Sequence, residues 1–322
     1  MARPKIIVTR RWPAEVEAAL TANYDVELNE QDRPMSADEL RQALSAADAV
    51  LVTVTDRITA EILSVEPLRA KFLGNFGVGF EHIDIPAATA RDITVTNTPD
   101  VLTDCTADLA MTLLLMAARR AGEGERLVRS RSWTGWHPTQ LMGTKVTGKT
   151  LGLIGMGRIA CAVAKRAHLG FGLKILFSDP QRPPPEVAAE LSAEQCSLEE
   201  VLAKSDFISL HCPGGRSTYH LIDANELKQM KPGAILVNTA RGEVVNNRAL
   251  IDALRNGDIA AAGMDVYEGE PMLNEGFLTL DNVVLLPHLG SSSRETRIAM
   301  GNRVLQNLDA FFSGDAPHDK LG

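Results

Sequence analysis

Three side chains in the second half of the sequence could carry out proton transfer at a carbonyl group: Arg241, Glu270 and His288. Imidazole readily donates a proton near neutral pH, and a carboxylate beside it favours the protonated ring and fixes its orientation. The planar guanidinium of Arg241 can bind a carboxylate and polarise an adjacent ketone. The set suits a 2-keto acid whose carbonyl is being reduced, although Glu268 competes with Glu270 for the role of the carboxylate.

A glycine-rich motif near the middle of the chain indicates what could deliver the reducing equivalents. An apolar strand at 150–154 runs into Gly155-x-Gly157-x-x-Ala160 and then into a helix-forming segment. Gly155 permits the tight turn, Gly157 lets the backbone approach a pyrophosphate, and Ala160 allows close packing of helix on strand. The helix N-terminus offers N–H groups to the phosphates, so this order predicts a dinucleotide site.

The acidic residue of this motif, Asp179, follows the next apolar strand. Its carboxylate can accept hydrogen bonds from an adenosine ribose and would repel a 2′-phosphate. We therefore expect NAD as the cofactor in preference to NADP, even though Arg182 lies close to the same turn.

Short apolar strands that alternate with helical patterns position these residues. Strands are expected at 6–9, 26–28, 49–54, 71–75, 93–97, 150–154, 173–177, 207–211, 234–238, 261–266 and 283–286. Helices are expected at 13–22, 36–46 (with Ser36 as N-cap), 86–91, 103–119, 159–168 and 294–312. We expect 130–148 to be irregular and 313–322 to be loosely held. Because ligands bind beyond the carboxyl ends of parallel strands, Arg241, Glu270 and His288 can converge at one sheet edge.

The alternation of strands and helices predicts the fold class and the domains. Continuous apolar strands between helices imply parallel sheets covered on both faces. We expect an α/β protein with two Rossmann-like or flavodoxin-like doubly wound parallel-sheet domains and a cleft between them. A substrate-binding (catalytic) domain would comprise 1–98 and 290–322, with the helix at 294–312 crossing back to cover it. An NAD-binding Rossmann domain would comprise 99–289.

Composition limits the range of partners. The chain has 322 residues and a net charge of −8, so a basic surface for nucleic acid or an anionic membrane is not expected. The four cysteines show no paired or zinc-ligand spacing and are expected to be small buried hydrophobes, with no metal site. With neither a signal peptide nor a long apolar run at its start, the chain is expected to be cytoplasmic.

Several further motifs give the chain its resemblance to a known family. The sequence resembles the D-isomer-specific 2-hydroxyacid dehydrogenase family over nearly its whole length. The matching motifs are Gly77-Val78-Gly79 with Ile83-Asp84, Thr106-Ala107-Asp108, Gly155-Met156-Gly157-Arg158-Ile159, His211 with Pro213 and Thr218, Asn238-Thr239-Ala240-Arg241-Gly242, Met264-Asp265-Val266-Tyr267-Glu268-Gly269-Glu270-Pro271 and Pro287-His288-Leu289-Gly290.

The resemblance implies a role for each matching residue. Arg241 would be the catalytic arginine that also binds the substrate carboxylate, Glu270 the acid partner and His288 the proton donor. The N–H groups of Val78 and Gly79 would hold the same carboxylate. Asp265 would contact the nicotinamide side of the cofactor and Thr106 would line its pocket. Further cofactor contacts would come from Gly155, Met156, Gly157, Arg158, Ile159, Asp179, His211, Cys212, Pro213, Thr218, Thr239, Ala240, His288 and Gly290.

Four positions depart from the family pattern. Ala160 replaces the third glycine of the fingerprint, a form that the family tolerates. Asp108 stands where glutamate is commoner, which leaves its role open. Gly214-Gly215 replaces a bulkier pair, which would loosen the wall on the adenine side.

Within the family, the stretch at 133–142 is most similar to glyoxylate and hydroxypyruvate reductases. The resemblance implies a homodimer in which Trp136 reaches the active site of the neighbouring subunit and binds substrate there. The expected partner is a small 2-keto or 2-hydroxy acid. Phosphoglycerate dehydrogenase or another D-2-hydroxyacid dehydrogenase is the alternative enzyme. A corepressor-like protein that binds NAD without turnover is the alternative of a different class, because such proteins retain the arginine, glutamate and histidine set.

Overall fold

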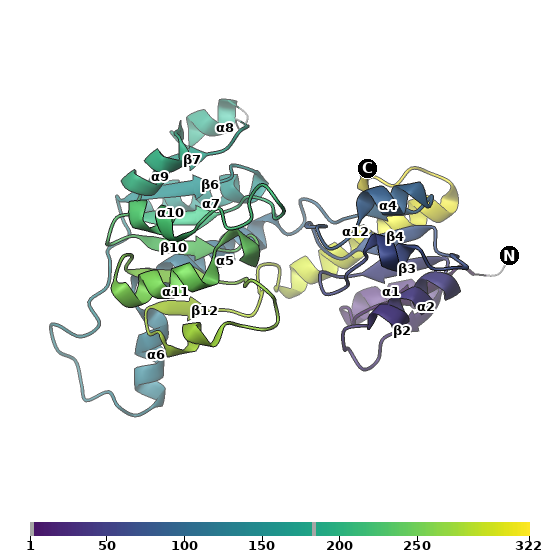
Figure 1. The fold of residues 1–322 in the computed structure, drawn as a ribbon, viewed down its shortest axis with the longest axis horizontal. Coiled ribbons are helices and arrows are strands. Elements are labelled where there is room, and N and C mark those ends of the chain that lie inside the picture. Colours follow the sequence, from purple (N-terminus) through teal and green to yellow (C-terminus); the bar gives the residue numbers. More distant parts are fainter. Residues whose placement is uncertain (1–2, 182–184) are drawn as a thin grey trace. The chain divides into compact units, whose positions relative to one another are not determined.

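The structure, a computed structural model, describes residues 3–181 and 185–322 and contains two compact units. Unit 1 comprises Met1–Leu102 with Ser291–Gly322, and unit 2 comprises Thr103–Gly290. Each unit is built on a sheet of mainly parallel strands with helices packed on it (Figure 1). The predicted fold class of two α/β parallel-sheet domains is confirmed.

The sheet of unit 1 has the strand order β13-β5-β4-β3-β1-β2. Its strands are β1 (Lys5–Val8), β2 (Asp25–Leu28), β3 (Ala49–Val52), β4 (Phe72–Asn75), β5 (Thr94–Thr96) and β13 (Lys320–Leu321). The first five pair in parallel, and β13 pairs with β5 in the antiparallel sense. Apart from this added edge strand, the order is flavodoxin-like.

Helices cover this sheet and begin at capped positions. They are α1 (Ala14–Asn23), α2 (Ala37–Ala46), α3 (Ala60–Leu63), α4 (Ile85–Ala90) and α12 (Arg294–Ser313). The Ser36 hydroxyl accepts a hydrogen bond from the Glu39 N–H, and the Glu39 carboxylate accepts one from the Ser36 N–H. This capping box confirms the predicted start of α2. The predicted return of the chain is also confirmed, because α12 packs on α1 and β4.

The C-terminal residues correct one expectation, because 313–322 are not loosely held. Asp319 is only 8% exposed and accepts hydrogen bonds from Arg303 at 2.5 and 2.7 Å and from Asn307 at 2.8 Å. β13 then adds to the sheet, with Lys320 opposite Thr96. The polar composition of the segment gave no sign of these partners, which lie on α12.

The sheet of unit 2 has the order β12-β11-β10-β9-β6-β7-β8, and all its strands are parallel. The strands are β6 (Thr150–Ile154), β7 (Lys174–Ser178), β8 (Glu194–Gln195), β9 (Phe207–Leu210), β10 (Ile235–Asn238), β11 (Ala261–Met264) and β12 (Val283–Leu285). This is the Rossmann order, and its strand order reverses between β6 and β9. Ligands bind at that reversal in open sheets of this kind.

Two helices of unit 2 correspond to predicted ones, at 103–119 and 159–168, and its other described helices were not predicted. The helices are α5 (Thr103–Ala118), α6 (Ala121–Arg129), α7 (Arg158–Phe171), α8 (Pro185–Glu190), α9 (Leu198–Lys204), α10 (Ala224–Gln229) and α11 (Asn247–Asn256), with short 3-10 turns η1 (Gly242–Val244) and η2 (Glu275–Thr279). α5 ends before Arg120, which adopts φ +52°, and α6 follows it. α6 was not predicted, because Gly122 and Gly124 weaken its helical pattern.

Three properties of the described residues bear on the expected partners. No helix in 3–181 or 185–322 is both long and apolar enough to cross a membrane. Within the same ranges, no group of three or more histidine, cysteine, aspartate or glutamate side chains could hold a metal ion. The four cysteines are free, and they are partly exposed rather than buried as expected.

Candidate active site

The glycine-rich turn follows β6 and opens α7. Gly155 has φ +86°, and a Cβ there would lie 2.7 Å from the backbone nitrogen of Cys212, so only glycine fits this crossing of two strand ends. Gly157 is the N-cap of α7, and a Cβ there would meet nothing within 4 Å. Ala160, in the first turn of α7, is fully buried. The turn therefore leaves open space at a helix N-terminus, which fits a phosphate group.

Asp179 lies beside this turn, directly after β7. One of its carboxylate oxygens accepts a hydrogen bond from the Met156 N–H at 2.7 Å, and the other accepts one from the Gln181 N–H at 2.7 Å. The carboxylate is thus fixed next to the glycine-rich turn, as a ribose-binding acid needs to be. Arg182, the neighbouring cation, lies outside the described residues.

The segment after β9 forms a neutral wall near the same turn. The His211 ring is 2.9 Å from the Ser209 hydroxyl, and desolvation lowers the pKa of His211 to about 4, so the ring is neutral at pH 7. Desolvation, together with the nearby charge of Asp179, raises the pKa of Cys212 to about 11. The Thr218 hydroxyl donates to the carbonyl of Pro213 at 2.7 Å and closes the loop.

His288 and Glu270 form a direct pair at the ends of β12 and β11. His288 Nδ1 lies 2.8 Å from Glu270 Oε2, while the other carboxylate oxygen accepts from the Tyr267 N–H at 2.8 Å. Burial raises the pKa of Glu270, but the hydrogen bond and charge of His288, the Tyr267 N–H and the charge of Arg241 outweigh it, so the net pKa is lowered. Glu270 is therefore an anion at neutral pH, placed to stabilise a protonated imidazole.

Arg241 follows β10 at the start of η1. Its Nη1 donates to the Ala240 carbonyl at 2.7 Å, and its own carbonyl accepts from the Asn238 side chain at 2.9 Å. The next residue, Gly242, packs directly on the backbone of Tyr267, where a Cβ would lie 1.9 Å from the Tyr267 carbonyl carbon. This contact joins the turn of Arg241 to the loop of Glu270. The structure therefore brings the three predicted residues together in unit 2.

Asp265 anchors the loop that carries His288. Its carboxylate accepts hydrogen bonds from the N–H groups of Leu289 at 2.7 Å and Gly290 at 2.8 Å, and the Thr106 hydroxyl donates to the Gly290 carbonyl at 3.0 Å. Desolvation raises the pKa of Asp265 to about 6, and these hydrogen bonds and His288 offset it only in part. Sequence reasoning missed this anchoring role, and contact of Asp265 with a cofactor stays a prediction.

The choice between Glu268 and Glu270 is decided by geometry. Glu268 Oε1 lies 3.1 Å from the Tyr219 hydroxyl and 3.1 Å from Nε2 of His220, so it holds a different histidine. Sequence reasoning did not predict this second pair, although adjacent Tyr219 and His220 were a visible signal. Asp108 likewise has a structural partner, because it accepts from Arg166 at 2.6 Å.

The remaining predicted residues differ in burial and in position along the chain. Thr239 is 9% exposed, and its buried hydroxyl has no hydrogen-bond partner among the described residues, which fits a ligand contact. Ala240 and Met156 are buried, Ile159 is partly buried, and Arg158 is exposed. Trp136 lies in the segment after α6 and is 80% exposed. Val78 and Gly79 follow β4 in unit 1.

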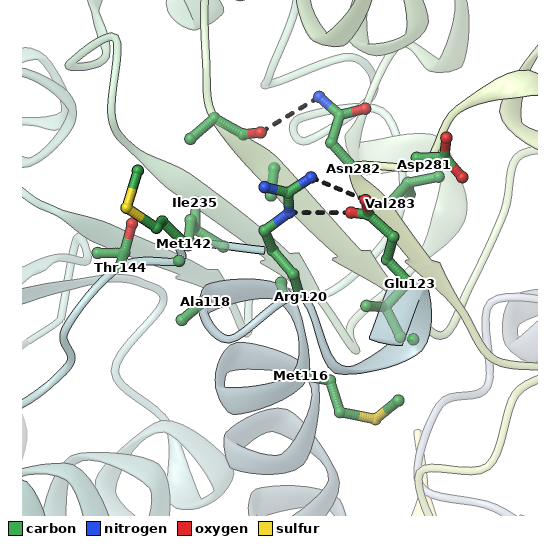
Figure 2. A pocket seen from close by; sticks show the side chains of 16 residues that line it. Met116, Ala118, Arg120, Glu123, Met142, Thr144, Ile235, Asp281, Asn282 and Val283 are labelled. Atoms are coloured by element: carbon green, nitrogen blue, oxygen red, sulfur yellow. Dashed lines mark hydrogen bonds and ion pairs between the residues drawn. The ribbon is translucent and has the colours of Figure 1, made fainter. Parts of the chain in front are cut away.

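A pocket of about 430 Å³ lies at the N-terminal ends of β10, β11 and β12 in unit 2 (Figure 2). Ile235, Ala261 and Val283, which begin β10, β11 and β12, form part of its lining, whereas Arg241 and His288 follow the ends of such strands. Arg120, which also lines it, is paired with Glu123 at 2.9 and 2.8 Å. The candidate residues therefore lie at the carboxyl ends of the strands and not in this pocket.

The fold and this site together define a class of protein: an oxidoreductase with a Rossmann unit and an imidazole–carboxylate pair beside an arginine. The family model described as D-isomer specific 2-hydroxyacid dehydrogenase, NAD binding domain, matches residues 111–290. The chain is 46% identical to the glyoxylate reductase of Thermococcus litoralis over 98% of this chain and 96% of that one. It is 45% identical to the glyoxylate reductase of Pyrococcus horikoshii over 98% and 95%.

Solved structures agree with these sequence matches. An NADPH-dependent glyoxylate/hydroxypyruvate reductase of Sinorhizobium meliloti, solved with NADP and malonate, superposes with a TM-score of 0.88. It is 33% identical over all of this chain and 97% of its own. The chain belongs to the D-isomer specific 2-hydroxyacid dehydrogenase family, as its motifs suggested.

Proposed function

We propose that this chain catalyses the NADH-dependent reduction of a small 2-keto acid, glyoxylate or hydroxypyruvate, to the D-2-hydroxy acid. The observation that carries the proposal is the His288–Glu270 pair, with the charge of Arg241 acting on it, in the same unit as the glycine-rich turn and Asp179. The similar glyoxylate reductases suggest the substrate class.

In this proposal His288 donates the proton that the carbonyl oxygen needs. Its Nδ1 is held by Glu270, so Nε2 is the nitrogen that gives up the proton. Glu270, an anion because its pKa is lowered, stabilises the imidazolium before the transfer. Arg241 binds the substrate carboxylate and polarises the ketone. The N–H groups of Val78 and Gly79 bind the same carboxylate.

Several features of unit 2 support a dinucleotide cofactor. The open space at Gly157, the N-terminus of α7 and the fixed carboxylate of Asp179 suit its phosphates and riboses. The Thr239 hydroxyl, which has no hydrogen-bond partner in the part of the chain that the structure describes, suits them too. When bound, the reduced nicotinamide supplies the hydride. Asp179 favours NADH, because its charge would repel a 2′-phosphate.

A spectrophotometric panel tests the reaction. NADH and NADPH oxidation are followed separately with glyoxylate, hydroxypyruvate, pyruvate, phosphohydroxypyruvate and branched keto acids. We expect turnover with the first two, and we expect Arg241→Ala to lose most of it while NADH binding survives. The exposed Arg248 provides the matched control, because Arg248→Ala removes a guanidinium elsewhere in the unit. A chain that binds NADH and reduces none of these acids would instead be a binding protein.

The cofactor preference has its own test. Asp179→Ala removes the charge expected to repel the 2′-phosphate, so the ratio of kcat/KM for NADH over NADPH should fall by about tenfold. The exposed Asp252 on α11 serves as the control, because Asp252→Ala lowers the net negative charge equally. An unchanged ratio in Asp179→Ala would remove this residue from the proposed role.

We also propose that the chain acts as a homodimer through α6 and the segment after it. Trp136 (80% exposed), Met142 (68%), Val128 (59%) and Trp133 (52%) gather there, and a large exposed apolar set is typical of an interaction surface. Light scattering after size exclusion should give twice the chain mass. We expect Trp136→Ala to lower kcat/KM for the keto acid, whereas a monomeric and fully active enzyme would refute this arrangement.

A further inference from the structure

The loop after β4 has its carbonyl oxygens held from within unit 1. Asn75, the fully buried last residue of β4, donates from its side-chain nitrogen to the carbonyls of Gly77 at 3.1 Å and Gly79 at 2.8 Å. Asn97, 7% exposed and just beyond β5, donates to the carbonyl of Val78 at 2.8 Å. Three successive carbonyls are therefore turned toward two buried amide side chains.

The direction of these carbonyls fixes the direction of the neighbouring N–H groups. In a planar trans peptide, the C=O of one residue and the N–H of the next point in opposite directions. The N–H of Val78 therefore points away from Asn75 and from the Thr98 N–H, which both donate to the Gly77 carbonyl. In the same way, the N–H of Gly79 points away from Asn97. Neither N–H donates to another described residue. Both are left for an acceptor that the described chain does not supply.

Further contacts fix the two asparagines themselves. The side-chain oxygen of Asn75 lies 3.1 Å from Nε2 of His82. Because the Asn75 nitrogen serves two carbonyls, its oxygen must face His82, and that oxygen can only accept, so Nε2 of His82 carries the hydrogen. The backbone N–H of Asn97 donates to the carbonyl of Asp319 at 3.3 Å, beside the Arg303 ion pair.

We propose that Asn75 and Asn97 are positioning residues that hold the loop so that the N–H groups of Val78 and Gly79 face the substrate carboxylate. This inference rests on the proposed function, because it names what prepares that carboxylate site. The asparagines touch neither the substrate nor the cofactor. They act by holding the two N–H donors in place before the substrate binds. Without them, the loop would have to be ordered on binding, and the free energy of that ordering would weaken substrate affinity.

The decisive variants separate hydrogen bonding from packing. Asn97→Ala removes the donor to the Val78 carbonyl, and Asn97→Leu removes the same donor while keeping a branched side chain with the same number of heavy atoms. Asn23, an exposed asparagine of α1 that also donates to a carbonyl, provides the control Asn23→Ala. We expect both Asn97 variants to raise KM for the keto acid about tenfold, the effect of one lost hydrogen bond to a charged group. Asn23→Ala should leave KM unchanged.

Two further readouts distinguish positioning from general damage. Oxamate, a keto-acid analogue that is not reduced, should show the same tenfold rise in Ki as the KM of the substrate. The Kd of NADH should stay within twofold, because the nucleotide motif lies in unit 2. Recovery of normal KM and Ki in Asn97→Leu would show that only volume matters and would overturn the proposal.

The unmodified enzyme gives a measurement that does not depend on a folded variant. In the presence of NADH, oxamate should slow hydrogen exchange at the amides of Val78 and Gly79, because both become hydrogen bonded. Tight oxamate binding without added protection at these amides would overturn the assignment of the loop while leaving the proposed function intact. A wild-type chain that neither reduces keto acids nor binds oxamate would overturn the proposed function first, and this inference with it.

Discussion

The loop after β11 carries two glutamates, and each holds a different histidine. Glu270 lies 2.8 Å from His288, and Glu268 lies 3.1 Å from His220. Both histidines adopt a left-handed backbone, with φ of +57° and +50°. Local strain is thus common to both pairs and does not distinguish a catalytic pair from a structural one.

The surroundings of the two pairs do differ. The His220 ring stacks on Tyr219, with centroids 4.0 Å apart, and the Tyr219 hydroxyl also donates a hydrogen bond to Glu268. In contrast, the charge of Arg241 helps to lower the pKa of Glu270, and Asp265 holds the loop that carries His288. These two differences, a nearby cation and a ring that is not stacked on a tyrosine, support the proposal that His288 and not His220 donates the proton.

Removing each imidazole in turn gives the largest expected difference between the pairs. His288→Ala should lower kcat by about a thousandfold, because general acid catalysis contributes on the order of 10² to 10⁴ in rate. His220→Ala should lower kcat by less than about fivefold, since it deletes only a loop contact. Steady-state kinetics with glyoxylate and NADH measure both. Equal losses in the two variants would mean that the pairs share one role.

Neutralising each glutamate sharpens the comparison through pH. Glu270→Gln removes the anion that favours the protonated donor, so kcat should fall by about a hundredfold. The decline of the reduction rate at high pH should also begin at lower pH than in the wild type. Glu268→Gln should leave the pH profile in place. A profile shifted by Glu268→Gln and not by Glu270→Gln would reverse the assignment.

Altering the anchor of the His288 loop should have an intermediate effect. Asp265→Asn replaces one carboxylate oxygen with an NH2 group, which cannot accept a hydrogen bond. One of the two N–H groups, that of Leu289 or that of Gly290, then loses its acceptor, so kcat should fall about tenfold. The wild-type rate should also decline as the pH falls through about 6, where Asp265 takes up its proton. Asp265→Asn should lack that step. A step of the same size in both enzymes would show that another group titrates.

The same residue predicts the pH dependence of stability. Its folded pKa of about 6 lies above the ordinary 3.8, so the folded state binds the proton more tightly than the unfolded chain does. The stability contributed by protonated Asp265 is fully present below about pH 4 and is lost as the pH rises through about 6. The Tm of the wild type should therefore fall relative to that of Asp265→Asn as the pH rises from about 4.5 to about 7.5.

Much of the fold could be predicted from sequence, and so could the meeting of the main candidate residues, because both follow simple spacing. Arg241 and His288 come directly after apolar strands, and parallel strands deliver their carboxyl ends to one edge. Glu268 and Glu270 could not be separated in this way, because they lie in an irregular loop where Gly269 adopts φ +78°. Which glutamate faces which histidine depends on that turn.

Contacts between distant polar residues were the other part that the sequence did not reveal. Asn75 and Asn97 are visible as polar residues at the ends of apolar strands, yet nothing in their spacing tells which carbonyls they bind. Asp319 appeared to belong to a loose polar end, although it is buried against Arg303. Each of these depends on a partner whose position is set by the tertiary fold.

The smallest predicted effect concerns the Tyr219 hydroxyl, which contacts the Glu268–His220 pair. Tyr219→Phe keeps the ring stacked on His220 and removes one hydrogen bond to Glu268, which leaves the His220 contact in place. Because Tyr219 is 56% exposed, water can replace the lost donor, and stability should fall by about 0.5 kcal/mol or less with kcat within twofold. Urea unfolding and kinetics measure both quantities. A large loss of kcat would show that Glu268 transmits its position to Glu270, and the two pairs would then have to be treated as one network.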